Sequence, residues 1–392
     1  MTNARLIRLL LGCIASACGA IAPAQNGPTD EPALAQDLHE QVLRLPVSVK
    51  NVYGRDETRS IAITVFKPAG DGPFPLVIMS HGRATADRRA QQGRQRFEPL
   101  ARYLVNKGFA VLVPTRVGYG DTYGDFDPED HGGCNAIRVE PVSIAASDQV
   151  IAALQFARTL PYVDVSRWVA MGQSVGGLTT VAVAWRNPPG LVGAINFAGG
   201  AGGDPKNRPG QPCSPLQIER LWRQHANTVQ VPMLWLYWEN DKYWGADIPK
   251  RWHQAFTEGG GRAELHTLPA SGIDGHAGIG IDMNAWVPLV EVYLARIGFT
   301  TSGMMLRPPA THHARIDDVS KLPTSQHNRE GAYKRFLEAK LPRAFAVGPK
   351  GAAGWATGDW AIGRALGSCQ RRGGDRCRLY AVDDDVVWPS EP

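Results

Sequence analysis

The segment Val-Ala-Met-Gly-Gln-Ser-Val-Gly-Gly-Leu at residues 169–178 limits the fold of this chain more than any other feature. An apolar run ends in Gly-Gln-Ser-Val-Gly at 172–176, and a run of small and apolar residues follows directly. This order is typical of a strand, a sharp turn and a helix, with the serine exposed at the turn. Glycines must flank the serine because a side chain there would collide with the neighbouring strand or helix.

The Gly-x-Ser-x-Gly pattern alone is weak evidence, because a chain with 43 glycines can contain it by chance. The segments around it make the interpretation specific. Apolar strands are expected at 76–80, 109–113, 168–171, 194–198, 233–238 and 263–268, and helices at 90–106, 143–160, 177–184, 216–225, 248–259 and 285–297. Two earlier segments, 47–52 and 61–66, are expected to pair as an antiparallel edge. This alternation predicts an α/β fold with a mostly parallel central sheet, helices on both faces, and a ligand site at the carboxyl ends of the strands.

The amino terminus has the features of a secretory signal peptide. Two arginines precede the apolar stretch 9–21, and Ala-Pro-Ala at 22–24 provides a small-residue cleavage site. We therefore expect residues 1–24 to be removed and the mature chain to be periplasmic or secreted. Lipid attachment at Cys13 is a less favoured alternative, since hardly any apolar region precedes it. No other stretch approaches the length of a membrane span, so no transmembrane segment is expected in the mature chain.

The charge of the chain argues against nucleic acid as a partner. The formal net charge is +5, and two of the arginines lie in the predicted signal peptide. The mature chain would carry about +3 and has no basic block, whereas nucleic-acid-binding proteins gather their basic residues on one surface.

Four cysteines remain after removal of the signal peptide: Cys134, Cys213, Cys369 and Cys377. An even number in an exported protein favours disulfide bonds. Cys369 and Cys377 flank the tight-turn sequence Arg-Arg-Gly-Gly and form the natural local pair, so Cys134 and Cys213 would join two loops. A zinc site is the weaker alternative, because there is no C-x-x-C and no nearby histidine at ligand spacing. No metal and no organic cofactor is expected.

The serine of the turn, Ser174, needs a base to take its proton and a carboxylate to orient that base. His276 follows the last predicted strand in a glycine-lined loop and is the expected base. Asp241 lies in a turn about three residues after the strand 233–238 and is the expected acid. Glu239, closer to the end of the same strand, is the alternative acid.

The oxyanion formed by such a serine needs two N–H donors. The backbone N–H of Val175, at the start of the helix, is one, and the N–H of Arg83, in the loop after the strand 76–80, is the expected second. The Arg83 guanidinium could instead bind a substrate anion or simply be exposed. Tyr119, Tyr243 and Trp244 lie in loops that should surround the site, where they would form an apolar substrate subsite or pack against the scaffold.

These features resemble the α/β-hydrolase superfamily and, within it, the dienelactone-hydrolase-like group. The resemblance rests on Ser-His-Gly at 80–82, the Gly-x-Ser-x-Gly turn, an acid after the following strands and a late Gly-His, and it covers about residues 40–298. It implies the same catalytic triad and the same oxyanion donors. Dienelactone hydrolases proper use a cysteine nucleophile, so the serine in this chain favours general ester hydrolysis over a dienelactone substrate.

The composition changes after residue 300. Residues 301–325 are rich in proline, threonine and histidine without periodicity, which is typical of a linker. Order returns in 326–392, which we expect to form a small α+β module after a hydrolase domain at 25–300. The tail resembles a small module of exported bacterial proteins, through Arg-Ala-Phe-Ala-Val at 343–347 and Cys-Arg-Leu-Tyr-Ala-Val-Asp at 377–383.

The sequence thus predicts an exported serine hydrolase that cleaves a small-molecule carboxylic ester through an acyl-enzyme. A peptidase of the same fold is the nearest alternative. Two further alternatives are a non-catalytic ligand-binding protein and a protein whose C-terminal module contacts a cell-envelope partner. Labelling of Ser174 by a fluorophosphonate would separate an active hydrolase from a silent relative.

Overall fold

The computed structural model describes residues 33–134, 137–299, 308, 310–358, 361–373 and 377–388. The predicted signal peptide lies outside these residues, as does the first part of the predicted linker. Contacts between residues unite the chain from Pro32 onward into a single unit that contains two β-sheets.

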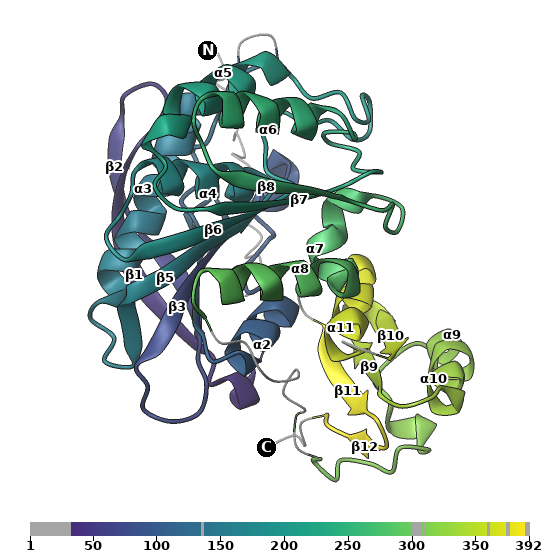
Figure 1. Cartoon of the computed structure of the whole chain (residues 1–392). Helices are drawn as coiled ribbons and strands as arrows, with labels where there is room; N and C mark the ends of the chain where they lie inside the picture. The colour runs from purple at the N-terminus through teal and green to yellow at the C-terminus, as the bar shows by residue number, and fades with distance from the viewer. Residues whose placement is uncertain are drawn as a thin grey trace, which may run out of the picture. The chain divides into compact units, whose positions relative to one another are not determined.

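The larger sheet has eight strands in the order β1-β2-β4-β3-β5-β6-β7-β8 (Figure 1). The strands are β1 (Gln41–Lys50), β2 (Asp56–Phe66), β3 (Phe74–Ser80), β4 (Ala110–Pro114), β5 (Val163–Gln173), β6 (Leu191–Phe197), β7 (Met233–Trp238) and β8 (Ala263–Leu268). β2 pairs antiparallel with β1 and with β4, and every other neighbouring pair is parallel. This topology confirms the predicted α/β fold and its antiparallel edge.

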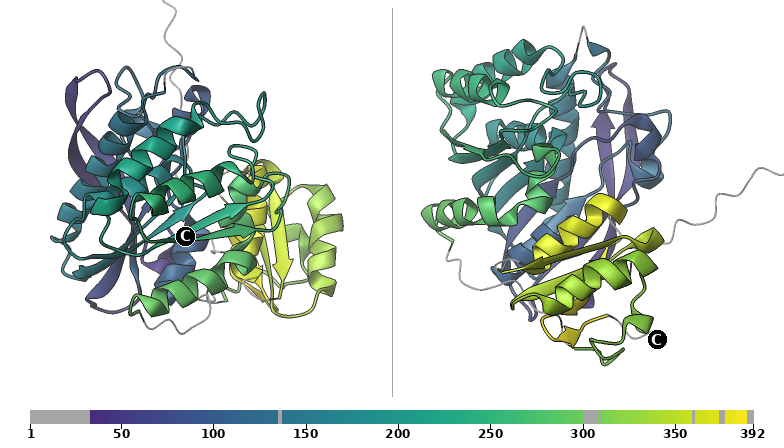
Figure 2. Two further views of the ribbon diagram at one scale, coloured as in Figure 1. Left: turned by 45° about the horizontal axis from the view of Figure 1, so that its top comes forward. Right: turned by 90° about the vertical axis from the view of Figure 1, so that its right-hand side faces the viewer.

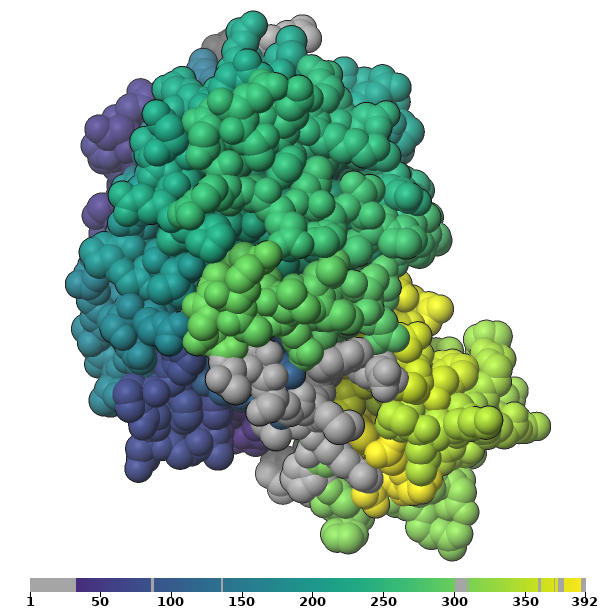
Figure 3. All heavy atoms as spheres, viewed as in Figure 1, coloured from purple at the N-terminus to yellow at the C-terminus, as the bar shows by residue number. Residues whose placement is uncertain are grey.

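Helices cover both faces of this sheet, and strand β3 shows why. Its alternate residues face opposite sides: Leu76 and Ile78 join one hydrophobic core, while Val77 and Met79 join the other. The helices are α1 (Ala86–Arg89), α2 (Glu98–Asn106), α3 (Val139–Ala157), α4 (Val175–Trp185), α5 (Pro215–His225), α6 (Ile248–Glu258), α7 (Gly278–Ile281) and α8 (Met283–Arg296). The first core contains side chains of α3 to α6, and the second contains side chains of α2 and α8. Helix α8, green in Figure 3, is also part of the molecular surface.

The helix predicted at 90–106 is shorter than expected. α2 begins only after Phe97, whose φ of 49° places it in the left-handed region and interrupts the helix. The preceding residues include Arg94 and Arg96, which donate hydrogen bonds at 2.6 and 2.7 Å to the buried carboxylate of Glu40. A buried charge cluster therefore determines the conformation of this segment, which its apolar spacing did not reveal.

The C-terminal residues form a four-stranded antiparallel sheet in the order β10-β9-β11-β12. Its elements are α9 (Gln326–Asn328), a π-helical segment (Arg329–Tyr333), α10 (Lys334–Glu338), β9 (Arg343–Val347), β10 (Ala353–Thr357), α11 (Ala361–Gly373), β11 (Arg378–Val382) and β12 (Asp385–Val386). In the right-hand view of Figure 2 this sheet lies between α11 and the helical segments that precede β9. This arrangement confirms the predicted α+β module.

Both faces of the four-stranded sheet are buried, but in different cores. Ala344 and Ala346 of β9 belong to the second core of the hydrolase sheet, whereas Phe345 and Val347 belong to a core of the module itself. Leu322, within the segment predicted as a linker, is also buried in that module core. The small residues of β9 allow α11 to pack closely on the sheet, and α11 in turn contacts α2 and α7.

The structure contains the two predicted disulfide bonds. Cys134 pairs with Cys213, and Cys369 pairs with Cys377. The first bond joins the loop before α3 to the loop before α5, and the second links α11 to β11. In the part of the chain that the structure describes, no helix combines the length and the apolar character that crossing a bilayer requires.

Candidate active site

Ser174 stands at a sharp turn between β5 and α4. Its backbone angles are φ 59° and ψ −123°, a conformation that costs a non-glycine residue free energy and recurs at functional sites. A Cβ added at Gly172 would lie 2.0 Å from the carbonyl oxygen of Gly176, and one added at Gly176 would lie 2.0 Å from that of Ser80. Both glycines are therefore required by the close approach of strand and helix, as the sequence predicted.

Asp241 and His276 form a hydrogen-bonded pair beyond the ends of β7 and β8. Nδ1 of His276 lies 3.0 Å from Oδ2 of Asp241. Since a carboxylate oxygen only accepts, Nδ1 is the donor of this bond, and Nε2 is the ring nitrogen that does not face Asp241. The other oxygen of Asp241 accepts the N–H groups of Tyr243 and Trp244 at 2.7 and 3.1 Å. Glu239, the alternative acid, is exposed at the end of β7.

A bond from the residue before the serine connects this pair to the sharp turn. Nε2 of Gln173 donates to the carbonyl oxygen of His276 at 3.1 Å. The backbone N–H of His276 donates to Asp274 at 3.0 Å, which fixes the loop from its other side. Among the described residues, the hydroxyl of Ser174 makes no hydrogen bond with His276; such catalytic bonds commonly shorten only when substrate binds.

The loop after β3 adjoins the serine. A Cβ added at Gly82 would lie 3.1 Å from Cβ of Ser174 and 2.9 Å from the side-chain oxygen of Gln173. The carbonyl of Gly82 and the N–H of Arg83 belong to one trans peptide, so they point in opposite directions. A hydrogen bond that fixes the Gly82 carbonyl therefore also sets the direction of the Arg83 N–H, the expected second oxyanion donor.

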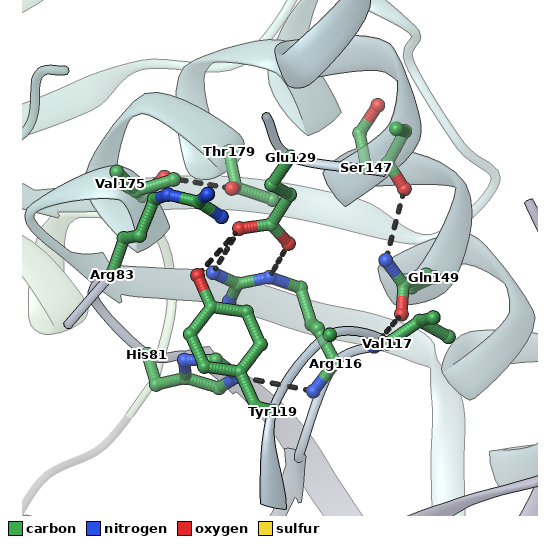
Figure 4. Close-up of polar contacts among 12 residues, drawn as sticks. His81, Arg83, Arg116, Val117, Tyr119, Glu129, Ser147, Gln149, Val175 and Thr179 are labelled. Carbon is green, nitrogen blue, oxygen red and sulfur yellow. Dashed lines mark hydrogen bonds and ion pairs between the residues drawn. The ribbon is translucent and has the colours of Figure 1, made fainter. Parts of the chain in front are cut away.

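His81 holds the Gly82 carbonyl. Its Nδ1 donates to the Gly82 oxygen at 2.7 Å, while its Nε2 accepts the backbone N–H of Arg116 at 3.0 Å (Figure 4). Burial, together with the charge of Arg116, holds the pKa of His81 well below its ordinary value. His81 is therefore a neutral imidazole in a single tautomer, with both ring nitrogens bonded to backbone.

The side chain of Arg83 is bound rather than exposed. Its guanidinium donates to both oxygens of Asp127, at 3.1 and 2.5 Å, and Arg89 binds the same carboxylate. Burial opposes the charge of Arg83, but the bonds and charge of Asp127 raise its pKa above the ordinary value. This pairing holds the side chain, which is only 14% exposed, and rules out the exposed alternative.

Tyr119 packs within the scaffold, which is the alternative that the sequence left open for it. It is fully buried, and its hydroxyl donates to Glu129 at 2.9 Å (Figure 4). Glu129 also forms a fully buried ion pair with Arg116, with bonds of 2.5 and 3.1 Å. Sequence reasoning missed Glu129 because it lies in the polar, glycine-rich segment 121–138, where nothing distinguishes a buried carboxylate from a solvated one.

Tyr243 and Trp244 support the Asp241–His276 pair. The ring of Tyr243 stacks on His276 with centroids 3.9 Å apart, and the ring of Trp244 meets the same imidazole edge-on. Trp244 is buried and its Nε1 donates to the carbonyl oxygen of Ala198 at 2.6 Å. The scaffold-packing alternative therefore describes Trp244, while Tyr243 is half-buried beside the imidazole.

The arrangement provides a hydroxyl, an imidazole oriented by a carboxylate, and backbone N–H groups at the start of a helix. The N-terminal N–H groups of a helix have no partners within it and carry partial positive charge, so they can bind a developing oxyanion. Within the described ranges, no three or more His, Cys, Asp or Glu side chains are grouped so that they could hold a metal ion. These groups suit nucleophilic substitution at a carbonyl carbon.

The sheet order and the strand–turn–helix around the serine define an α/β-hydrolase. A model of the dienelactone hydrolase family matches residues 64–276, and the chain belongs to this family. The protein is therefore a hydrolase with a serine at the position of the nucleophile.

Several solved structures resemble the chain. A dienelactone hydrolase from Klebsiella pneumoniae is 17% identical over 66% of this chain and 100% of its own, with a TM-score of 0.44. An esterase of Pyrococcus furiosus is 12% identical over 68% and 99% of the two chains, with a TM-score of 0.44. An acylaminoacyl peptidase of Pyrococcus horikoshii is 14% identical over 67% of this chain but only 42% of its own, with a TM-score of 0.45. A search of curated proteins found no match.

Proposed function

We propose that this hydrolase is exported and cleaves carboxylic esters through an acyl-enzyme formed on Ser174. The observation that carries the proposal is the 3.0 Å hydrogen bond between Nδ1 of His276 and Asp241. This bond leaves Nε2 to act as the basic nitrogen, and the loop that carries it is bonded to Gln173, the residue before the serine. A base with this tautomer is what a serine nucleophile requires.

In the first half of the reaction, His276 takes the proton of Ser174 as Oγ forms a bond to the ester carbonyl carbon. Asp241 remains ionised and stabilises the imidazolium. When the tetrahedral intermediate collapses, the carbon–oxygen bond to the leaving alcohol breaks and His276 gives its proton to that oxygen. Water then attacks the acyl-enzyme by the same steps, which releases the carboxylic acid and restores the serine.

The negative charge of each tetrahedral intermediate would be bound by the N–H groups of Val175 and Arg83. Val175 is the first residue of α4, so its N–H lies at the positive end of the helix dipole. The Arg83 N–H has its direction set from one side by the His81–Gly82 bond. Because neither donor has to reorganise during the reaction, each can lower the barrier.

Export is supported by the two disulfide bonds, which persist in oxidising compartments and are rare in the cytosol. Together with the predicted signal peptide, they favour a periplasmic or secreted enzyme. Detection of the cleaved amino terminus at residue 25 in an extracellular or periplasmic fraction would test this part of the proposal.

The catalytic part is tested with 4-nitrophenyl esters and matching 4-nitroanilides, together with a fluorophosphonate label. We expect the wild type to hydrolyse the esters and to be labelled. In Ser174→Ala, kcat for the esters should fall by a factor of at least ~10⁴ and the labelling should be lost. Ser60→Ala, at an exposed position of β2, is the control and should keep wild-type rates. Labelling that persists in Ser174→Ala would refute the nucleophile, and turnover of the amides alone would identify a peptidase.

A further inference from the structure

A cavity of about 290 Å³ lies beside the proposed catalytic residues. Its walls come from residues 95–100, from Gln173, from the segment 277–281, and from Gly367 and Arg371 of α11. This size is near the lower end for pockets that bind small molecules, roughly 300 Å³ and above. The last two residues belong to the C-terminal module, so the hydrolase sheet alone does not enclose the cavity.

The cavity adjoins the proposed catalytic residues through their neighbours in sequence, and Ser174 and His276 themselves do not line it. Gln173 precedes Ser174, and Ala277 follows His276; both line the cavity. The hydrogen bond from Gln173 to the carbonyl oxygen of His276 runs between these two segments. The residues before the proposed nucleophile and after the proposed base therefore both contribute to the wall of this cavity.

The helix of the module forms its wall through direct backbone contact. A Cβ added at Gly367 would lie only 1.7 Å from the carbonyl oxygen of Gly280 in α7. α11 can approach α7 this closely only because position 367 has no side chain. Since α7 begins two residues after His276, the module packs against the segment that carries the proposed base.

Two side chains at the cavity, those of Gln95 and Arg371, have N–H groups without an acceptor among the described residues. The side-chain nitrogen of Gln95, a residue that is 6% exposed, is buried without a hydrogen-bond partner among the described residues. Arg371 donates at 3.3 Å to the carbonyl oxygen of Gly367 in its own helix, and no described carboxylate pairs with it. Arg371 as a whole is exposed to solvent, and partial burial of its guanidinium, with the charge of Arg372, lowers its pKa.

The other arginine of the cavity is already neutralised. Arg96 forms ion pairs with Glu40 and Glu98, and its side chain is almost fully buried. The remaining wall, apart from Gln173, is apolar and includes Phe97, Leu100 and Ile279. The cavity thus combines an apolar interior with an available amide donor and an available guanidinium, a combination that suits an apolar group ending in a hydrogen-bond acceptor.

We propose that this cavity is a substrate subsite built jointly by the hydrolase sheet and the C-terminal module. It receives the arm of an ester that is apolar near the scissile bond and ends in an acceptor, best a carboxylate, bound by Arg371 and Gln95. The proposal rests on the ester hydrolysis proposed above and adds a substrate class to it. It gives the module a role in specificity, distinct from attachment to a cell-envelope partner.

The test compares esters that differ only in the end group of the arm. On the acyl side, 4-nitrophenyl hydrogen adipate is compared with 4-nitrophenyl hexanoate. On the alcohol side, the acetate of 4-(hydroxymethyl)benzoate is compared with 4-methylbenzyl acetate. In one of the two series, Arg371→Gln should reduce kcat/KM for the carboxylate ester by about 10- to 100-fold relative to its neutral partner, since charge-assisted hydrogen bonds have this strength.

Two further variants complete the design. Arg372→Gln is the matched control, because Arg372 is the adjacent arginine, bonds to Ala353 at 2.8 Å and does not line the cavity. Gln95→Leu, which removes the donor but keeps the side-chain volume, should also lower the preference for the carboxylate ester. An equal response to Arg371→Gln and Arg372→Gln, or no change of the ratio in either series, overturns the subsite.

A short ester separates the two proposals. 4-Nitrophenyl acetate has no arm that could reach the cavity, so its turnover reports on the catalytic residues alone. If 4-nitrophenyl acetate is hydrolysed but Arg371→Gln leaves the ratio of kcat/KM between each carboxylate ester and its neutral partner unchanged, only the subsite is wrong. If the folded wild type hydrolyses neither 4-nitrophenyl acetate nor any of the longer esters, the proposed ester hydrolysis itself is wrong. Melting temperatures of all variants show whether a loss reflects misfolding.

Discussion

The ring of Tyr243 is stacked on the imidazole of His276, with centroids 3.9 Å apart and 24° between the ring planes. The backbone N–H of the same tyrosine donates to Asp241, the partner of that imidazole. One residue therefore supports both the proposed base and the proposed acid. The backbone bond can persist in most substitutions, whereas the ring contact depends on an aromatic side chain.

We accordingly expect Tyr243→Ala to lower kcat/KM for a short ester by about 2- to 10-fold, the range that a stacking contact of roughly 0.5–1.5 kcal/mol allows. Tyr243→Phe keeps the ring and should stay within about 2-fold of the wild type. Tyr53→Ala is the control, because Tyr53 is 64% exposed in the turn between β1 and β2. Steady-state kinetics measure kcat/KM of each variant. If Tyr243→Phe is as impaired as Tyr243→Ala, the ring has no role of its own.

Asp241→Asn should abolish most activity while preserving the fold. The asparagine oxygen can still accept the N–H groups of Tyr243 and Trp244, but its amide would donate to Nδ1 of His276. The imidazole would then carry its hydrogen on Nε2 and could not accept the serine proton. We expect kcat to fall about 10⁴-fold. Glu239→Gln, at the exposed alternative acid, should have wild-type kcat; a comparable loss there would reopen the assignment.

His81 should make the fold sensitive to mild acid. Its folded-state pKa is held well below the unfolded value of about 6.5, first by burial and then by Arg116. Below pH 6.5 the unfolded chain binds a proton that the folded chain excludes, so stability is complete above that pH and falls as the pH drops, by up to ~1.4 kcal/mol per pH unit. His81→Gln removes this contribution and should flatten the profile between pH 6.5 and 5.

Urea unfolding at several pH values measures this slope. His131, whose pKa is also lowered by burial, leaves a smaller residual dependence in the His81 variant. The carboxylates with lowered pKa values, including Glu40 and Asp127, titrate below the window of the experiment. His313→Gln is the control and should retain the wild-type slope. An unchanged slope in His81→Gln would exclude His81 as its source.

The sequence was sufficient for the sheet and for the sharp turn because these depend on local patterns. Apolar runs of strand length alternate with helical segments, and the glycines around Ser174 are dictated by contacts within a few residues. The disulfide pairing was also predictable, because the spacing of Cys369 and Cys377 left a single partner for Cys134.

What sequence reasoning did not provide are contacts between polar residues far apart in the chain. His81 was recognised only as a marker of the loop, yet it bonds to the backbone of Arg116, 35 residues later. Glu129, in a polar segment, becomes fully buried only because Arg116 and Tyr119 surround it. Burial of a charge depends on its tertiary partners, which neither composition nor periodicity records.

Gly172→Ala should destabilise the protein strongly. The new Cβ would lie 2.0 Å from the carbonyl oxygen of Gly176, and backbone atoms cannot move aside as a flexible side chain can. We expect a loss of at least about 3 kcal/mol in the free energy of unfolding, or failure to fold. Gly124→Ala is the matched control, because a Cβ there would meet nothing within 4 Å. Thermal melts of both variants test the prediction, and similar melting temperatures would contradict it.

The disulfide between Cys134 and Cys213 should contribute more stability than the one between Cys369 and Cys377. The two bonds close loops of 79 and 8 residues. In the chain-entropy model the longer loop corresponds to about 4.5 kcal/mol and the shorter to about 2.5 kcal/mol. Replacing both cysteines of each pair by serine therefore gives two double variants that differ in one property, the length of the loop that is opened.

Opening the longer loop should also loosen the segment before α3. Cys134–Cys213 joins the segment that contains Glu129, the partner of Arg116, to the loop before α5. Opening it should lower the melting temperature most and raise the susceptibility of residues 121–138 to proteolysis, because few other covalent constraints hold that segment. Denaturant unfolding and limited proteolysis, each with the Cys369/Cys377 variant as reference, measure both effects. Equal losses of stability in the two variants would show that unfolded-chain entropy does not govern either bond.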